Sequence, residues 1–325
     1  MGSPDPRQID GIGGAHPLTS KVALIWPSAG NDVDVEYLFL QVAVDTDVVS
    51  DRQNCGNLLA GVGQYALERG MVDAPDGDTA SVRIRMVNTD SVATSTFSLA
   101  AGRPRYDGET AISGVPGTAA EVRLDFEDTA GSTCGQLLPT GSVMDVIDGV
   151  EVTCVDNGMP TVVLRAADLG IDGAESCDVL EANAPFRARL EEIRLGAGTL
   201  MGLGDVTDAT VPKMTLVSEP RAGGSICTRT FIPHRCHDAI GVLGAVSVAT
   251  ALRLVGGVGS ELLVRGVDPA VVEVEHPTGT FAARVELAQD PESPAGVAVG
   301  RSGIVRTARK LMDGLIFPRT TNEEH

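Results

Sequence analysis

QNCGNLLAGVGQYALERG, residues 53–70, is the stretch on which the fold of this chain depends. Apolar side chains recur along it at helical spacing, and Gly70 follows as a residue that commonly ends a helix. Ala60 and Gly63 leave a second surface that is small enough for close packing. The stretch therefore predicts an apolar helix at the centre of a folded unit, preceded by a polar pentapeptide with Cys55 in its middle.

The start of this helix has its own chemistry. N–H groups in the first turn of a helix lack intrahelical partners, and the helix dipole is positive there. A cysteine at that place predicts a carboxylate-binding pocket that contains a thiol, and it makes Cys55 a candidate acid or base. The alternative is that Cys55 is a small buried side chain that packs the helix start, as free cysteines commonly do.

Lys21 lies in a short strand-like run, residues 18–25, and is one of three lysines in the chain. A dry pocket would desolvate its ammonium and make the amine a usable general base. From the residues alone, a surface lysine at the end of a strand is the favoured interpretation, with catalysis beside Cys55 as the alternative.

The remaining pattern predicts one folded unit followed by a second of the same kind. In the first half, strand-like runs surround the helix at 18–25, 35–44, 82–87, 95–100 and 121–126. Turn residues become frequent from Gly131, where we place the boundary. The second half offers helices at 174–182, 185–195 and 239–255, and strands at 150–155, 161–164, 214–217, 229–232, 261–264, 271–274, 281–287 and 303–317.

These runs predict a duplicated α+β architecture. The first half covers residues 1–135, lacks a leading strand and is completed by residues 300–325; the second covers residues 136–299. Cys236 precedes the apolar helix 239–255 as Cys55 precedes the first helix. If the halves face each other, we expect both helix starts to meet in one cleft that holds a substrate with several carboxylates.

Composition limits the partners. The chain has 325 residues, 43% of them hydrophobic, which is enough for two cores. Its 25 Lys and Arg against 44 Asp and Glu give a net charge of −19, which disfavours nucleic acid and anionic membranes as partners. The apolar run 239–252 is too short and too rich in small residues to span a bilayer. Six dispersed cysteines and no secretory leader favour reduced thiols, so we expect a soluble cytoplasmic protein.

Cys227, His234, Cys236 and His237 are zinc-ligand types, but their spacing is not that of a structural zinc site. Arg235 in their midst opposes a cation. We therefore predict no metal site.

Several separate runs resemble the methylaconitate isomerase-like family, in its branch of 4-oxalomesaconate isomerases and tautomerases. They are MGSPDPRQIDGIGGAHPLTSKV (1–22), VDVEYLFLQ (33–41), QNCGNLLAGVG (53–63), VDNGMP (155–160), TFIPHRCHDAIGVLGAVSVAT (230–250) and HPTGTF (276–281). Together they extend over nearly the whole chain. The resemblance implies a fold similar to diaminopimelate epimerase. That fold is α+β with two pseudo-symmetric halves, each a curved sheet or barrel around a central helix, and a cofactor-free site between them.

The resemblance also implies roles for individual residues. It makes Lys21 the proton-abstracting lysine and Cys55 the cysteine of the same pocket. The further substrate-binding positions that it implies are Ser20, Asn54, Gly56, Asn57, Asn157 and His237.

The implied substrate is the small tricarboxylate 4-oxalomesaconate, from the degradation of lignin, gallate or protocatechuate. Lys21 would take a proton from carbon, and Lys21, Cys55 or water would return one, either in a 1,3-allylic isomerisation or in a keto–enol tautomerisation. The alternatives are a 2-methylaconitate cis–trans isomerase, a non-catalytic tricarboxylate-binding accessory protein, and a racemase that pairs Cys55 with Cys236. A homodimer is left open.

Family members carry a further N-terminal segment, with an Arg-Gly-Gly-Thr-Ser-Lys-Gly-like loop that helps to form the carboxylate pocket. This chain begins after that loop. We therefore expect the 325-residue form to lack an interior strand and part of its site, and to fold or turn over weakly.

Overall fold

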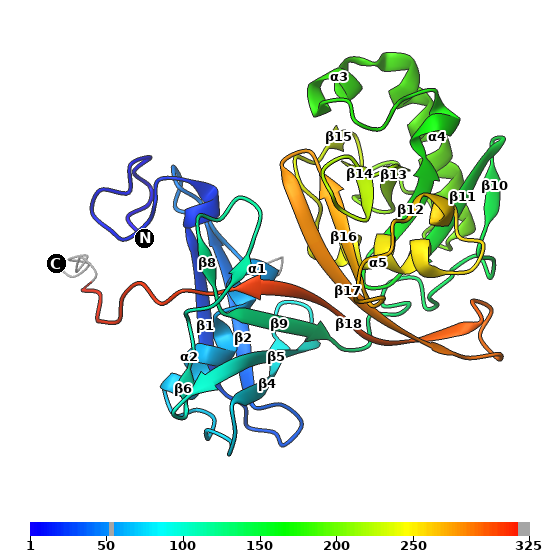
Figure 1. The fold of residues 1–325 in the computed structure, drawn as a ribbon. Helices are drawn as coiled ribbons and strands as arrows, with labels where there is room; N and C mark the ends of the chain where they lie inside the picture. The colour runs from blue at the N-terminus through cyan, green and yellow to red at the C-terminus, as the bar shows by residue number, and fades with distance from the viewer. Residues whose placement is uncertain (52–54, 318–325) are drawn as a thin grey trace. The chain divides into compact units, whose positions relative to one another are not determined.

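The computed structural model describes residues 1–51 and 55–317, and it divides the chain into two units (Figure 1). The first unit consists of Met1–Thr110, Thr118–Leu124 and the chain from Arg306 onward, and the second of Ala111–Gly117 and Asp125–Val305. The chain therefore leaves the first unit within β9 (Glu121–Phe126) and returns to it within β18 (Val297–Thr307). The fold class is α+β, as predicted.

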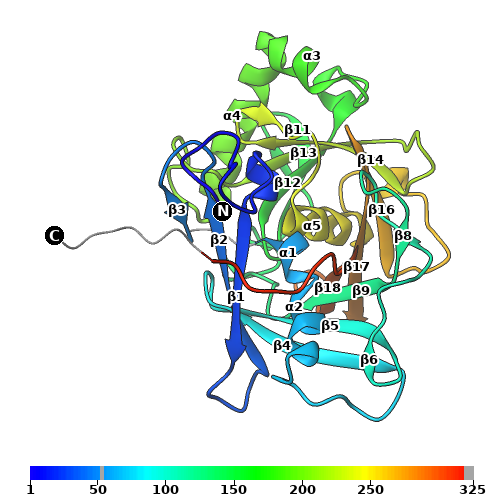
Figure 2. The ribbon, with the colours of Figure 1, turned by 90° about the vertical axis from the view of Figure 1, so that its left-hand side faces the viewer.

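In the first unit a sheet surrounds one short helix. Its strands are β1 (Lys21–Pro27), β2 (Val35–Val42), β3 (Val49–Ser50), β4 (Thr79–Met86), β5 (Ser91–Ala100) and β6 (Arg103–Pro104), with the separate pair β7 (Thr110–Ala111) and β8 (Thr118–Ala119) at the unit's border. The sheet order is β1-β2-β4-β5-β9, with β3 paired to β2 and β6 to β5. β1 and β2 run antiparallel and side by side, with Lys21 opposite Gln41 (Figure 2).

The predicted central helix of this unit is present, but in two pieces. α1 (Gly56–Leu59) ends at Ala60, and α2 (Val62–Glu68) starts from Gly61, whose N–H donates to Leu58 O at 3.2 Å. The predicted close packing at Gly63 is confirmed, because a Cβ there would lie 2.9 Å from both the Phe97 ring and the Ser95 hydroxyl. Contacts from α2 to β1, β4, β5 and β6 place it at the centre of the unit.

The second unit has a longer sheet and longer helices. Its strands are β10 (Asp145–Ile147), β11 (Val150–Asp156), β12 (Pro160–Arg165), β13 (Lys213–Ser218), β14 (Ile226–Ile232), β15 (Arg235–Cys236), β16 (Val271–His276) and β17 (Gly279–Gln289). The sheet order is β18-β17-β16-β14-β13-β12-β11-β10, with β15 paired to β14. Its helices are α3 (Cys177–Ala182), α4 (Ala184–Leu200) and α5 (Val242–Arg253). Short 3₁₀ turns occur in the two units at η1 (Pro17–Thr19), η2 (Ala166–Leu169) and η3 (Ser260–Leu262).

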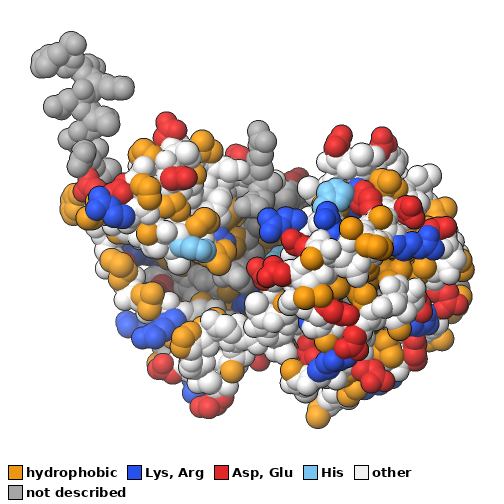
Figure 3. Space-filling view, turned by 90° about the horizontal axis from the view of Figure 1, so that it is seen from above, with side chains coloured by type: hydrophobic (Ala, Val, Ile, Leu, Met, Phe, Trp, Pro, Cys, Tyr) orange, Lys and Arg blue, Asp and Glu red, His pale blue; other side chains and the backbone are white. Residues whose placement is uncertain are grey.

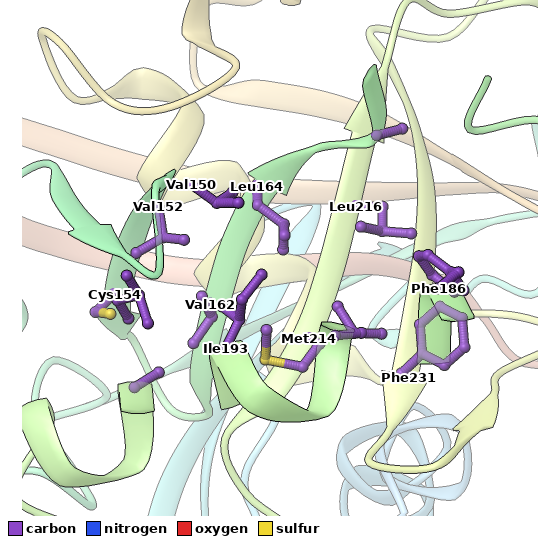
Figure 4. Packing of buried hydrophobic residues seen from close by; sticks show 14 of the residues in the cluster. Val150, Val152, Cys154, Val162, Leu164, Phe186, Ile193, Met214, Leu216 and Phe231 are labelled. Atoms are coloured by element: carbon purple, nitrogen blue, oxygen red, sulfur yellow. The ribbon is translucent and has the colours of Figure 1, made fainter. Parts of the chain in front are cut away.

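Helices cover both faces of this second sheet. Val162 and Leu164 of β12 belong to a buried cluster with Ile193 of α4, while α5 contacts β11, β12, β16 and β17 (Figure 4). The rings of Phe186 and Phe231 close one end of the cluster, with centroids 5.6 Å apart and planes at 58°. Burial on both faces is why β12 is a continuous apolar run instead of an alternating one.

Several predicted elements differ from the structure, and three of these differences have a physical reason in the contacts or backbone angles. The strand expected at 261–264 is replaced by η3, because Gly259 has φ +81° and the Leu262 N–H bonds back to its carbonyl at 3.0 Å. The helix expected from residue 239 begins at Val242, because Gly241 is extended with ψ 147°. The last strand ends at Thr307, and beyond it Lys310 binds Glu68 of α2 at 2.7 Å, so the chain there follows a helix instead of a sheet edge.

No helix in the described part of the chain is long and apolar enough to cross a membrane. Figure 3 shows acidic and basic side chains interspersed over the face that it presents.

Candidate active site

Lys21 and Cys55, the two residues predicted to do the chemistry, lie side by side in the first unit. The Lys21 Nζ is 3.7 Å from the Cys55 Sγ, and both side chains are half-buried. The Nζ also lies 5.9 Å from the centroid of the Phe39 ring, which is a cation–π distance. An amine and a thiol this close can share a proton, because either can donate it or accept it.

The turn before β1 holds Lys21 in place. The Ser20 carbonyl accepts hydrogen bonds from the Val42 N–H at 3.0 Å and from Gln41 Nε2 at 3.1 Å. The Ser20 hydroxyl is fully buried and donates to Gln8 Oε1 at 2.9 Å. The substrate-binding role of Ser20 stays a prediction; what its bonds do here is fix the residue before Lys21.

Cys55 is the N-cap residue of α1, with extended backbone (φ −132°, ψ 101°). Its carbonyl accepts the N–H of Leu59 at 3.0 Å and the hydroxyl of Tyr37 at 3.4 Å. Burial, and then the electrostatic influence of the Cys55 side chain, raise the pKa of Tyr37, so its phenol stays neutral and able to donate. Cys55 is therefore fixed through its backbone, and its side chain lies at the start of the helix.

The other residues predicted at this helix start belong to α1, except Asn54, which lies outside the described residues. Gly56 is the first residue of α1, and Asn57 is the second and is exposed. The Asn57 Oδ1 accepts a hydrogen bond of 2.8 Å from the Nε of Arg306. Arg306 is buried, and that burial lowers the pKa of its guanidinium to about 10, against the opposing electrostatic influence of the Cys55 side chain.

Asn157 is fully buried in the second unit. Its Nδ2 donates to the Thr250 hydroxyl at 2.8 Å and to the Ser302 hydroxyl at 2.9 Å, and its Oδ1 accepts from Thr129 at 2.5 Å. Its backbone N–H donates to Ser247 at 3.1 Å. Both donors of the amide are thus engaged inside the unit, so Asn157 would have to release a partner in order to bind substrate; that role stays a prediction.

His237 is half-buried between β15 and α5. Burial lowers its pKa, with Asp238 opposing and Lys213 adding to the shift, so the neutral ring is favoured. The Nδ1 accepts the N–H of Ala239 at 2.9 Å, which leaves the ring proton on Nε2. A neutral imidazole with a donor at Nε2 is compatible with the predicted binding role, which stays a prediction.

The prediction of a second cysteine on the first turn of a central helix is wrong. Cys236 lies in β15, where it pairs with Phe231, and only 8% of its surface is exposed. Its Sγ is 2.8 Å from the Sγ of Cys177. The chain is still in the sheet at Cys236, because α5 begins only at Val242.

The four residues of zinc-ligand type (Cys227, His234, Cys236 and His237) each contact other groups of the protein. Cys227 donates to Gly173 O at 3.5 Å, and His234 Nδ1 lies 3.6 Å from the Glu191 carboxylate. Within residues 1–51 and 55–317, no three His, Cys, Asp or Glu side chains gather as metal ligands would.

Three neighbours of the Lys21–Cys55 pair were not predicted from sequence: Tyr37, Phe39 and Arg306. Tyr37 and Phe39 lie on the buried side of β2, and the alternation of that strand marks them only as core residues. Arg306 is 249 positions from Asn57, so no local spacing connects them. Arg306 belongs to a C-terminal segment with several other basic residues, and a group of charges of that kind is usually a solvated surface.

Comparison with known proteins identifies the class. The family model described as "PrpF protein" matches residues 1–318, and this chain belongs to that family.

Two curated relatives are equally similar to it. "(4E)-oxalomesaconate Delta-isomerase" of Novosphingobium sp. (strain KA1) is 54% identical over 319 residues, which is 98% of this chain and 87% of the relative. "4-oxalomesaconate tautomerase" of Pseudomonas putida (strain KT2440) is 54% identical over 317 residues, 97% of this chain and 86% of the relative. The resemblance read from the sequence is confirmed.

A solved structure supports the fold. The crystal structure of methylitaconate-delta-isomerase superimposes with a TM-score of 0.84 at 32% identity, over 96% of this chain and 85% of that one. The predicted α+β fold class is thereby confirmed.

Proposed function

We propose that this chain is an isomerase that moves a proton and a double bond in 4-oxalomesaconate without a cofactor. Family membership and two named isomerase or tautomerase relatives, each 54% identical, support the reaction class and the substrate. The observation that carries the mechanism is the Lys21 Nζ at 3.7 Å from the Cys55 Sγ.

The chemistry needs one base and one acid. Lys21, as the neutral amine, removes a proton from a carbon that is flanked by a carboxylate and by an alkene, and the electron pair spreads into a dienolate. N–H groups in the first turn of α1 stabilise that charge. The ammonium of Lys21, or the thiol of Cys55 after proton exchange with it, then protonates the far carbon of the allyl system. One proton leaves, one returns, and the double bond shifts with no net oxidation, so no redox cofactor is required.

Two versions of the reaction fit this pair. In the allylic version both proton transfers occur at carbon, whereas in the keto–enol version one occurs at oxygen. The printed names of the two 54% identical relatives differ on this point. The Lys21–Cys55 pair supplies a base and an acid for either version, so the position of deuterium in the product distinguishes the two.

A second candidate is 2-methylaconitate isomerisation. The "2-methyl-aconitate isomerase" of Shewanella oneidensis is 31% identical over 97% of this chain. The same lysine and cysteine would serve, because the substrate again carries an acidic proton between a carboxylate and an alkene. The lower identity makes it the runner-up, ahead of a non-catalytic tricarboxylate-binding protein.

We further propose that the enzyme acts in the degradation of aromatic compounds and works in the cytoplasm. Its six cysteines are all free, and a reducing compartment would keep Cys55 as a thiol.

The test is proton NMR of 4-oxalomesaconate in D₂O with the parent enzyme and its Lys21→Ala variant. We expect deuterium at a carbon of a shifted double bond, and a rate at least ~10³-fold lower in the variant, since a positioned base contributes about 10²–10⁴-fold. Lys310→Ala is the matched control, because Lys310 pairs with Glu68 on the surface, and it should keep the parent rate.

Each other outcome would support a different reaction, substrate, base or function. Deuterium at carbon only in the keto tautomer would establish the keto–enol version. Turnover of 2-methylaconitate alone would select the runner-up. Exchange that survives in Lys21→Ala would move the base to Cys55, and no exchange with the parent enzyme would leave the binding protein.

A further inference from the structure

Arg306 joins the candidate site from the far end of the chain. It lies near the end of β18, in the part of that strand that belongs to the first unit, and only 9% of its surface is exposed. Its Nε donates to Asn57 Oδ1 at 2.8 Å. The last long strand is thereby bonded to the second residue of α1.

Arg306 is a cation that folding removes almost completely from water. Moving a guanidinium out of water costs several kcal/mol unless nearby groups compensate. Burial lowers the pKa of Arg306 to about 10, and the electrostatic influence of the Cys55 side chain acts in the opposite direction. Arg306 is therefore within electrostatic reach of the Cys55 side chain that Lys21 also contacts, so both residues act on one small region of the unit.

The hydrogen bond from Arg306 also fixes the orientation of the Asn57 carboxamide. A guanidinium has donors and no acceptor, so the Asn57 atom that faces Arg306 must be the amide oxygen. The Nδ2 group is then on the opposite branch of the carboxamide, and Asn57 is exposed. Without Arg306 the amide could rotate and present either end to the solvent.

We propose that Arg306 is a positioning residue, which holds the Asn57 carboxamide so that its Nδ2 group donates to a carboxylate of the substrate. The inference rests on the proposed function, since it takes the substrate to be a polycarboxylate. A positioned donor that meets a non-reacting carboxylate contributes to ground-state and transition-state binding alike. Loss of Arg306 should therefore raise KM and leave kcat nearly unchanged.

Asn57→Asp is the most informative variant. An aspartate keeps an oxygen that accepts from Arg306, but its second carboxylate oxygen replaces the Nδ2 donor. We expect an unfolding midpoint no lower than that of the parent, and binding of propane-1,2,3-tricarboxylate at least ~10-fold weaker by calorimetry. The added negative charge also repels a tricarboxylate, so the comparison with Asn57→Ala, which adds no charge, is needed: a purely structural contact predicts unchanged binding in that variant.

Arg306→Met and Arg306→Lys complete the test. We expect the methionine variant to raise KM for 4-oxalomesaconate about 10-fold with kcat within about threefold, and the lysine variant to recover part of the loss. If Arg306 acts through Asn57, adding Asn57→Ala to Arg306→Met should weaken binding no further than Asn57→Ala alone.

Unchanged tricarboxylate binding in Asn57→Asp would overturn the proposal, and so would fully additive losses in the double variant. The Asn57→Asp result does not depend on whether Arg306→Met folds. If the parent binds the tricarboxylate but does not turn over 4-oxalomesaconate, the proposed function fails while these binding measurements still decide the role of Arg306. A parent that binds no tricarboxylate would overturn both.

Discussion

The two units place the same residue types in opposite circumstances. Cys55 of the first unit is half-buried beside the amine of Lys21, whereas Cys236 of the second is buried in a strand beside the thiol of Cys177. Asn57 is exposed and receives one bond from Arg306. Asn157, in the turn between β11 and β12 of the second unit, is fully buried.

This contrast shows that residue type and position before a helix do not make a site. At α1 the backbone turns into the helix directly at Cys55, so the thiol stays near the first turn. Before α5 the chain makes another strand, and the side chain of Cys236 enters the core. The first unit therefore carries the candidate chemistry, and in the second unit the same residue types hold the fold together.

Replacing Cys55 and Cys236 one at a time with alanine should give the largest difference in kcat between the two units. We expect Cys55→Ala to lower kcat on 4-oxalomesaconate about 10²-fold or more while the folding free energy stays nearly the same. Cys236→Ala should keep kcat within about threefold and lose about 1 kcal/mol of stability, because it leaves a small cavity. Steady-state kinetics and urea unfolding measure both, and equal losses of kcat in the two variants would break the comparison.

Truncating the asparagines should separate stability from binding. Asn157→Ala leaves the hydroxyls of Thr129, Thr250 and Ser302 without their amide partner, and we expect a loss of about 3 kcal/mol. Asn57→Ala should lose less than about 1 kcal/mol, because its side chain is exposed.

Two spectroscopic probes measure the stability of the asparagine variants. Circular dichroism follows the whole chain, and the single tryptophan, Trp26, reports on β1 of the first unit. A stability loss in Asn57→Ala as large as that in Asn157→Ala would show that both residues are structural.

Glu275 is a buried polar residue of the second unit whose hydrogen bonds stabilise the fold. Burial opposes its ionisation, but hydrogen bonds from the N–H groups of Arg221, Gly224 and Ala222 outweigh burial and lower its pKa. A carboxyl whose folded pKa is depressed stabilises the protein above its unfolded pKa and loses that contribution as the pH falls through the folded value.

Glu275→Gln should therefore cost about 2 kcal/mol at pH 7, because hydrogen bonds to a charged group are lost. The difference from the parent should shrink as the pH falls below the ordinary pKa of 4.5. Thermal unfolding across pH 3–7 measures it, and a pH-independent difference would contradict this origin.

The smallest effect should come from the half-buried histidines. Burial lowers the pKa of His237 and of His276 below the ordinary 6.5, so the unfolded chain binds protons first as the pH falls. Stability should thus decline below pH 6.5 and level off below the folded pKa values. His276→Gln should remove about 0.5 kcal/mol or less of this decline, and an identical pH profile in that variant would exclude His276 as a contributor.

Much of the framework could be predicted from local pattern. The alternation in β4 and the apolar run of β12 are features of a few consecutive residues, and the packing at Gly63 follows from the absence of a side chain. The bounds that failed, at η3 and at the start of α5, depend on the backbone angles of Gly259 and Gly241. Glycine permits both helical and extended angles, so the residue alone does not choose between them.

The sequence by itself determined the α+β class and, through motifs that resemble a family, singled out Lys21 and Cys55 as candidate catalytic residues, because these depend on residue identity and on short motifs. Only the tertiary structure decided that the Lys21 Nζ lies 3.7 Å from the Cys55 Sγ, and that Arg306 reaches Asn57 across 249 positions. The tertiary structure also decided the place of Cys236, whose Sγ lies 2.8 Å from that of Cys177 and not at a helix start. Contacts between distant segments form only when strands pair and cores pack, and no local pattern encodes which polar group will meet which.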